Sequence, residues 1–257
     1  MQEPKELRKK IREGAFHQPT SGYCPSYVQA NVVIVPKQYA FDFFLFAYRN
    51  QQACPLIDVL DAGEYKSRLA IGSDIRTDVP RYRVYQNGEL VNELSTIHDL
   101  WQDDMVTFLI GCSFTFESIL IDEGIPLRHV EENKNVAMYV TNRPTDSTAV
   151  FHGPLVVSMR PIHRDLVKKA GDITAQHPNM HGAPVHIGDP SELGITDLSS
   201  PDFGEAVTIK EDEVPVFWAC GVTPQMAAVQ SKLPLMITHS PGHMFVTDVT
   251  NEEFLKK

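Results

Sequence analysis

The chain has 257 residues, of which 42% are hydrophobic and 22% charged, a composition typical of a globular protein with a sizeable core. Its formal net charge of −10 at pH 7 argues against nucleic acid or an anionic membrane surface as a partner. No apolar run approaches the roughly 20 residues of a membrane-spanning helix. The four cysteines are scattered and the first residues lack the pattern of a secretory signal, so we expect a reduced, cytoplasmic protein.

The first hundred residues predict helices and strands in alternation. Residues 4–15 are typical of a charged surface helix, residues 27–35 of a strand, and residues 38–49 of a buried helix. Asn87-Gly88 separates two alternating runs and predicts a β-hairpin.

Two uncharged apolar runs predict buried strands that turn directly into helices. The run at 105–112 (MVTFLIGC) ends at Cys112-Ser113 and precedes an expected helix at 114–123. The run at 214–220 (VPVFWAC) is followed by Gly221 and by Thr223, which we expect to be a helix N-cap. In open α/β sheets such turns hold ligands at the carboxyl edge, and helix N-termini attract anions. We therefore predict two anion-binding helix ends beside one cleft.

Between these runs, strands and one helix in the order β-β-α-β indicate a separate small unit. The predicted fold class is α/β, a mixed or mostly parallel three-layer α/β sandwich with a smaller inserted α+β domain. Residues 1–124 and 211–257 would form the main discontinuous domain, and residues 125–210 the smaller one.

Cysteine and histidine side chains form the first group of candidates for chemistry at such a site. Cys112 and Cys220 lie beside helix starts, where a thiolate is stabilised, but free cysteines are also common core residues. Histidines cluster late in the chain, and we name three as candidate proton donors or acceptors: His181, His186 and His239. Pro241-Gly242 interrupts the spacing between His239 and His243, so we predict no metal.

Arginines form a second group of candidates, because guanidinium groups match carboxylates bidentately. Arg76, Arg81 and Arg83 lie close together before the hairpin, and Arg160 ends a predicted strand. Ion pairs with Asp74 and Asp78 are the alternative role for the first group. No P-loop, dinucleotide-binding, α/β-hydrolase or kinase signature occurs, and we predict no cofactor.

Long motifs cover almost the whole chain, from about Gly22 to Asp248: YVQANVVIVP, DIRTDVPRYRVY, LWQDDMVTFLIGCSFTFE, GPLVVSMRP, HGAPVHIGDP, PDFG, EVPVFWACGVTPQ and ITHSPGHMFVTD. Together they resemble the D-glutamate cyclase family. Bacterial members of the family usually carry the label "putative hydro-lyase". The resemblance implies a two-part α/β architecture and conversion of D-glutamate to 5-oxo-D-proline with loss of water. It assigns no catalytic residues, so the candidates above rest on physical arguments.

We accordingly expect a lyase acting on a small carboxylate substrate. The turns at Cys112-Ser113 and Gly221-Thr223 would bind carboxylates with help from the arginines, and a histidine or Cys220 would serve catalysis. Two alternatives remain: a dehydratase of a hydroxy acid, and a non-catalytic protein that binds or senses a small carboxylate. Assembly into a homo-oligomer is left open.

Overall fold

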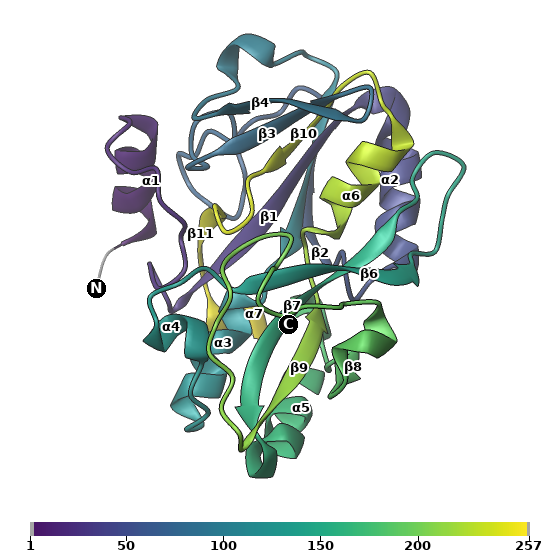
Figure 1. Cartoon of the computed structure of the whole chain (residues 1–257). Coiled ribbons are helices and arrows are strands. Elements are labelled where there is room, and N and C mark those ends of the chain that lie inside the picture. The colour runs from purple at the N-terminus through teal and green to yellow at the C-terminus, as the bar shows by residue number, and fades with distance from the viewer. Residues whose placement is uncertain (1–2, 256–257) are drawn as a thin grey trace.

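The computed structural model describes residues 3–255, which fold into two sheets surrounded by helices (Figure 1). The helices are α1 (Pro4–Arg12), α2 (Lys37–Arg49), α3 (Phe114–Asp122), α4 (Arg128–Glu131), α5 (Val167–Ala175), α6 (Thr223–Ser231) and α7 (Asn251–Leu255). The strands are β1 (Tyr27–Pro36), β2 (Leu56–Leu60), β3 (Tyr82–Gln86), β4 (Glu89–Leu94), β5 (Met105–Gly111), β6 (Ala137–Pro144), β7 (Pro154–His163), β8 (His186–Ile187), β9 (Glu213–Ala219), β10 (Met236–His239) and β11 (Phe245–Thr250). The larger sheet has seven strands in the order β2-β5-β1-β10-β3-β4, with β11 also paired to β1, and the smaller has the order β6-β7-β9-β8.

Strand β1 is the centre of the larger sheet. It pairs with β5 from Ala30, opposite Gly111, to Pro36, opposite Met105. Two strands share its other edge, because β10 pairs with the half of β1 that contains Val33 and β11 with the half nearer its start. The loop between β10 and β11 therefore begins beside the middle of β1.

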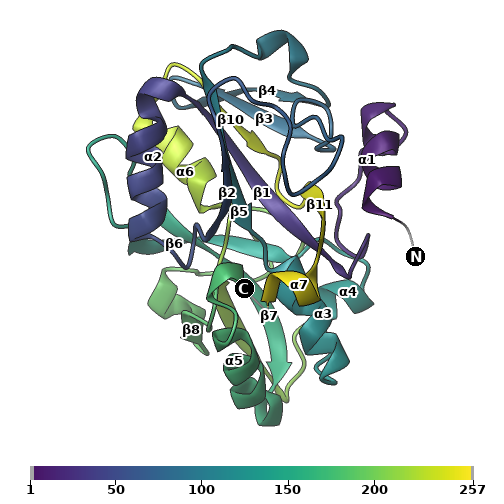
Figure 2. The same ribbon diagram turned by 180° about the vertical axis from the view of Figure 1, so that it is seen from behind.

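The expectation of a mixed or mostly parallel sheet is wrong, because every strand pairing within residues 3–255 is antiparallel. Long apolar runs indicated parallel strands because such strands are buried on both faces. Here the larger antiparallel sheet is also covered on both faces. Helices α2 and α6 lie side by side over one face (Figure 2), where Phe43 and Ala227 join one core cluster. The irregular segment between β2 and β3 supplies Ile75 and Val79 to the cluster on the other face. The second outer layer is thus not helical.

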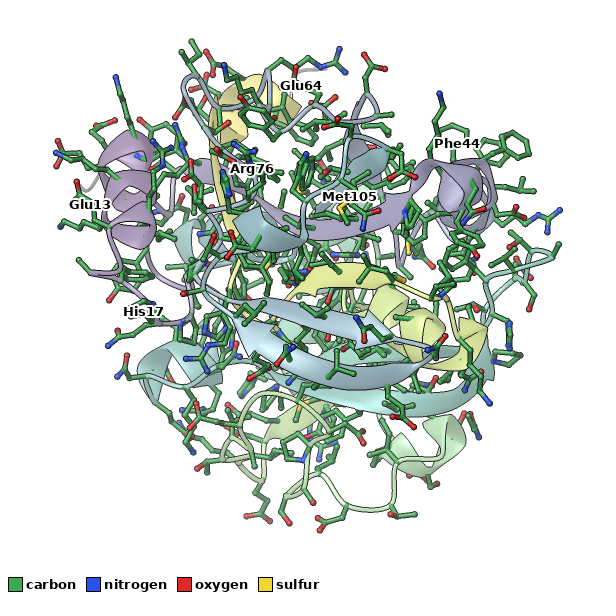
Figure 3. All side chains as sticks on the ribbon, turned by 90° about the horizontal axis from the view of Figure 1, so that it is seen from above. Glu13, His17, Phe44, Glu64, Arg76 and Met105 are labelled. Atoms are coloured by element: carbon green, nitrogen blue, oxygen red, sulfur yellow. The ribbon has the colours of Figure 1, made fainter. Side chains whose placement is uncertain are left out.

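Helix α2 shows how the helical face is built. Phe43 and Phe46 are fully buried, whereas Phe44 is 45% exposed and lies at the periphery of the molecule (Figure 3). The predicted hairpin between β3 and β4 is confirmed, with φ angles of 51° at Asn87 and 86° at Gly88. Positive φ at both positions is what a two-residue type I′ turn requires.

The smaller sheet gathers strands from both sides of the expected boundary at residue 211. Strand β9, which we had placed in the main domain, pairs along β7 from Val157 opposite Ala219 to His163 opposite Glu213. Helix α5 packs on this sheet, and the Trp218 indole donates a hydrogen bond of 3.1 Å to Thr174. The second sheet is therefore not formed by residues 125–210 alone.

Candidate active site at the junction of the two sheets

The turns after β5 and β9 have the same local hydrogen-bond pattern. At Cys112, the Phe114 N–H donates to Sγ at 3.5 Å and the Thr115 N–H donates to the carbonyl at 3.2 Å. At Cys220, the Val222 N–H likewise donates to the thiol, and the Thr223 N–H donates to the carbonyl at 3.0 Å. The similarity expected from the two apolar runs is thus present in the folded chain.

These two turns lie in different sheets and yet converge. The Asn31 side chain on β1 donates to the Gly111 carbonyl at 2.7 Å and also packs against Gly221. A Cβ at Gly221 would lie 2.2 Å from Asn31 Nδ2, so only glycine fits there. Cys112 and Cys220 belong to one buried cluster that fills this region. We call this region the junction.

A buried arginine forms the centre of the junction. Arg160 on β7 is fully buried and donates to Ser113 Oγ at 2.9 Å and to Ser158 Oγ at 2.9 Å. It also forms a two-donor ion pair with Glu117 on α3. The rings of Phe116 and Trp218 lie 5.1 and 5.5 Å from the guanidinium carbon, within cation–π range. Sequence analysis had named Arg160 and Ser113 separately, and the structure brings them into contact.

Glu117 links this arginine to a histidine. The His129 Nε2 atom lies 3.2 Å from Glu117 Oε1, an ion-pair distance at which the angle is too poor for a hydrogen bond. Burial alone would raise the pKa of Glu117, but the charges of His129 and Arg160 outweigh burial and lower this pKa to about 2. Glu117 is therefore an ionised carboxylate inside the protein at neutral pH.

His129 also lines a cavity of about 280 Å³ between residues 18–23 and residues 129–135. Tyr23, Lys134, Asn135 and Glu205 contribute to its wall. A larger cavity of about 420 Å³ lies beside Ala219, and its one charged lining residue, Arg49, donates to the Ser147 carbonyl. Of these two cavities, the smaller one is lined by His129, which lies beside the buried Glu117.

Thr223 has a different local role from the one expected. It is the first residue of α6 and not its N-cap, which is Val222. Its hydroxyl accepts from the Val156 N–H at 3.1 Å and donates to the Cys220 carbonyl at 2.8 Å. Ser113 is the N-cap of α3, but its hydroxyl makes no capping bond because it accepts from Arg160 instead. Both side chains hold the junction together.

The thiols of the junction are buried and protonated. Burial raises the pKa of Cys112 far above its ordinary value, and burial raises the pKa of Cys220 to about 11. The helix starts beside them do not overcome this cost. A nucleophilic role for Cys220 would require a base that takes its proton.

The three predicted histidines are dispersed. His181 is buried with Nδ1 2.6 Å from the Gln52 carbonyl, and burial lowers its pKa to about 4. His239 is buried with Nδ1 against the backbone of Val32, and burial lowers its pKa to about 3. His186 stands on β8, at the edge of the smaller sheet, with Nε2 2.7 Å from the Asp189 carbonyl. The positive charge of Arg160 contributes to the lowered pKa of His181, after burial.

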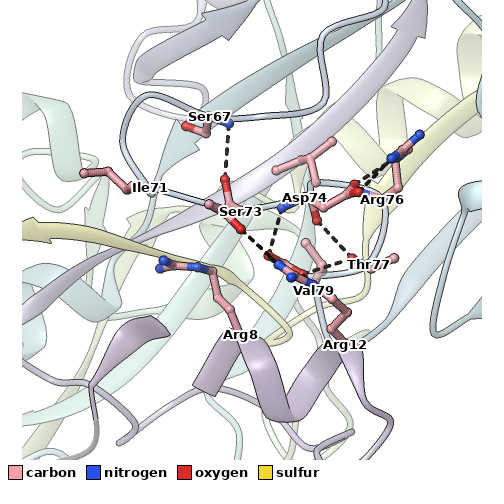
Figure 4. A network of polar contacts seen from close by, with 12 residues as sticks. Arg8, Arg12, Ser67, Ile71, Ser73, Asp74, Arg76, Thr77 and Val79 are labelled. Carbon is pink, nitrogen blue, oxygen red and sulfur yellow. Dashed lines mark hydrogen bonds and ion pairs between the residues drawn. The ribbon is translucent and has the colours of Figure 1, made fainter. Parts of the chain in front are cut away.

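The arginines before the hairpin are divided between structural contacts. Arg76 pairs with Asp74 through bonds of 2.9 and 2.7 Å, in the network that also holds Arg8 and Arg12 of α1 (Figure 4). Arg81 lies 3.8 Å from Glu93 at the surface. These two arginines are thus not brought to Ser113 or Arg160.

Arg83 has one contact that points toward the second turn. It pairs with Glu93 at 2.7 Å and donates to Gln225 of α6 at 3.2 Å. The amide of Gln225 in turn donates to the His239 carbonyl at 2.9 Å. Arg83 therefore contacts the first turn of the helix that Thr223 begins.

Three residues of the junction were missed by sequence reasoning. Asn31 is a polar residue in the apolar run YVQANVVIVP, and Glu117 is the single charged residue in SFTFESIL. An isolated polar residue in a buried segment usually has a partner, so both were detectable. His129 stands among charged residues on the short helix α4, and no local pattern marks it.

The described residues contain neither a cluster of metal ligands nor a membrane-spanning helix. Across residues 3–255, no three His, Cys, Asp or Glu side chains gather in a way that would hold a metal ion. Over the same range, no helix combines the length and the apolar character needed to cross a membrane.

Together these features define an α/β protein whose two antiparallel sheets meet around a buried ion-pair network. The sequence profile described as D-glutamate cyclase matches residues 106–248. The chain belongs to the D-glutamate cyclase family. The matched region contains Ser113, Glu117, Arg160 and both turns.

Bacterial relatives extend the match to nearly the whole chain. A protein named "putative hydro-lyase" from Psychrobacter arcticus is 56% identical and covers 97% of this chain and 95% of its own. Relatives of the same name are 55% identical in Thermoanaerobacter sp., with 97% and 94% covered, and 56% identical in Bacillus licheniformis, with 98% and 96% covered. A solved structure of a nitrogen repressor-like protein from Methanococcus jannaschii covers 95% of this chain and 98% of its own, at a TM-score of 0.39 and 11% identity.

Proposed function

We propose that the chain is a lyase that removes water from a small carboxylate, and that the reaction takes place at the junction. The observation that carries this proposal is the fully buried ion pair of Arg160 and Glu117, joined by Ser113. A buried ion pair stabilises a fold no better than well-packed apolar residues do, so its presence in the core supports a chemical role. The family profile and the name of the relatives support the same reaction class.

D-Glutamate is the substrate to test first, because the family profile carries its name. In this reaction the α-nitrogen bonds to the γ-carbon while one C–O bond of the γ-carboxylate breaks. The ammonium group gives two protons to the departing oxygen, which leaves as water, and no oxidant or reductant is needed. The site must bind carboxylates, accept an ammonium proton and protonate the departing oxygen.

Ser113 and Arg160 fit the carboxylate-binding role when they act together. Arg160 donates to Ser113 Oγ, which leaves the serine proton as a donor strengthened by the buried positive charge. Gly221 and Thr223 remain predictions for binding a second carboxylate, although the Thr223 N–H already donates to the Cys220 carbonyl. His181, His186, His239 and Cys220 remain predictions for the proton-transfer roles.

Product analysis tests this function and separates the two alternatives. The purified protein is incubated with a panel of D- and L-amino acids and hydroxy acids, and loss of one water is followed by mass spectrometry. Formation of 5-oxo-D-proline supports the proposal, whereas an ultraviolet-absorbing alkene identifies a dehydratase. Saturable binding without product, at high protein concentration, identifies a non-catalytic carboxylate-binding protein and refutes the lyase.

A serine variant then tests where the reaction occurs. Ser113→Ala removes the hydroxyl bonded to Arg160, and we expect a loss of about 100-fold or more in kcat/KM, as for one oxyanion-binding donor. Ser199→Ala is the matched control, because Ser199 is exposed and bonds only to Asp197. Equal activity of both variants would remove the junction from the reaction.

A further inference from the structure

Two residues that line the cavity of about 280 Å³ carry buried polar atoms without a hydrogen-bond partner within residues 3–255. These atoms are both ring nitrogens of His129 and Oδ1 of Asn135. A buried polar atom without a partner costs about 1–3 kcal/mol, so their presence on one cavity wall favours a ligand that satisfies them.

The carboxylate of Glu117 determines which nitrogen of His129 carries the proton. It lies 3.2 Å from Nε2 and is ionised, so electrostatics place the proton on Nε2. Whenever the ring is neutral, its lone pair is then on Nδ1, which has no partner within residues 3–255. A histidine whose far nitrogen faces a buried carboxylate is oriented as a general base.

The side chain of Asn135 is held in place on the cavity wall. Its backbone N–H donates to Glu205 at 3.0 Å, and its side chain covers Gly242, where a Cβ would lie 2.6 Å from Nδ2. The unpartnered Oδ1 accepts hydrogen bonds only, so it suits an ammonium or hydroxyl group. Lys134 supplies a positive charge on the same wall, with Nζ bonded to Glu132 at 2.7 Å and to the Ala206 carbonyl at 2.8 Å.

We infer that this cavity binds the substrate and that His129 is the catalytic base and acid of the reaction. The inference rests on the proposed lyase function. The ammonium group of the substrate is bonded to Asn135 Oδ1 and gives one proton to His129 Nδ1, and the freed electron pair forms the bond from nitrogen to the γ-carbon. His129 then returns this proton to the departing oxygen. That oxygen takes its second proton from the same nitrogen as the C–O bond breaks and leaves as water, so the ring ends the cycle as it began. Glu117 is a positioning residue, because it acts through His129.

The main experiment compares His129→Gln with His98→Gln in the full chain, with D-glutamate as substrate. We expect His129→Gln to lower kcat by about 100-fold or more, the usual contribution of general acid–base catalysis. His98 is the matched control because its side chain is 62% exposed and lies 3.8 Å from Asp99, so His98→Gln should retain full kcat. If the wild type forms product and His129→Gln keeps its kcat within about threefold, the inference is overturned and the proposed function stands.

A binding measurement decides the inference when the wild type forms no product or the variant does not fold. Glutarate is titrated into wild-type protein carrying nitrogen-15 histidine, and the His129 ring resonances are followed. A saturable shift of Nδ1 supports the cavity as a carboxylate site, and its absence overturns the inference. Failure of the proposed function is seen separately, as absence of product with every acid of the panel.

The role of Glu117 has a readout that a purely structural role would not change. Glu117→Gln removes the carboxylate that holds the proton on Nε2, so the nitrogen-15 shifts of His129 should move toward a mixture of tautomers. An unchanged tautomer in a folded Glu117→Gln protein would refute the positioning role.

Discussion

Replacement of Glu117 by glutamine should change how the stability of the protein depends on pH. The pKa of Glu117 is lowered from its ordinary value of 4.5 to about 2, because His129 and Arg160 outweigh the cost of burial. At about 1.4 kcal/mol per pKa unit, ionisation of this one group contributes about 3 kcal/mol to the free energy of unfolding. The contribution comes from a group with a side-chain exposure of only 7%, so solvent screens it little.

The sign of the effect follows from the lowered pKa. The contribution is complete above pH 4.5, the ordinary pKa, and is lost as the pH falls toward 2. About 2 kcal/mol of it should be gone at pH 3, where the unfolded chain binds the proton and the folded chain does not. Glu117→Gln cannot titrate and leaves Arg160 unpaired, so it should be less stable at pH 7 by about 3–5 kcal/mol.

Urea unfolding at pH 7 and at pH 3 measures both quantities. The difference in unfolding free energy between the wild type and Glu117→Gln should shrink by about 2 kcal/mol at the lower pH. Glu123→Gln is the control, because Glu123 follows the same helix but is exposed and pairs with Lys169. A difference that stays constant between the two pH values would refute the buried ionised carboxylate.

Three further predictions concern the groups around the junction. Gly221→Ala should lower the free energy of unfolding by about 1–3 kcal/mol in a denaturant titration, because its Cβ would lie 2.2 Å from Asn31 Nδ2. Gly171→Ala is the control, because a Cβ there meets no neighbour closer than 3.8 Å and should not lower this free energy. Thr223→Val should cost about 1–3 kcal/mol in the same assay because it leaves the buried Val156 N–H unpaired, and Thr223→Ser should retain stability. His181 and His239 should show neutral nitrogen-15 shifts at pH 5, because burial lowers their pKa values to about 4 and about 3; protonated shifts there would contradict their burial.

Local sequence patterns predicted the elements of the site but not their arrangement. The apolar runs, the glycine and cysteine turns and the Asn-Gly hairpin depend on nearby residues, so β5, β9 and the β3–β4 turn were predictable. Strand direction was not, because a strand buried on both faces has the same pattern in parallel and antiparallel sheets. The pairing of β9 with β7 depends on residues far apart in the sequence, so the residue pattern of β9 alone does not predict it.

The same limit applies to the residues of the site. Arg160 and Ser113 were found because each has a local signal, a strand end and a helix start. Their partner Glu117 has a weaker signal, as one charge in an apolar helix, and His129 has none. The proposed role of His129 depends on the carboxylate of Glu117, which lies beside it only in the folded chain. This contact joins α4 to α3.

The junction requires both sheets to be in place. Asn31, Ser113 and Glu117 come from β1 of the larger sheet and from the turn and helix after β5, whereas Arg160 and Ser158 come from β7 of the smaller sheet. Separating the sheets would break the ion pair of Arg160 with Glu117 and the hydrogen bond of Arg160 to Ser113. The close approach of Gly221 to Asn31 joins the same two sheets through packing. The contacts that form the proposed active site are therefore also the contacts that make the two sheets one cooperative unit.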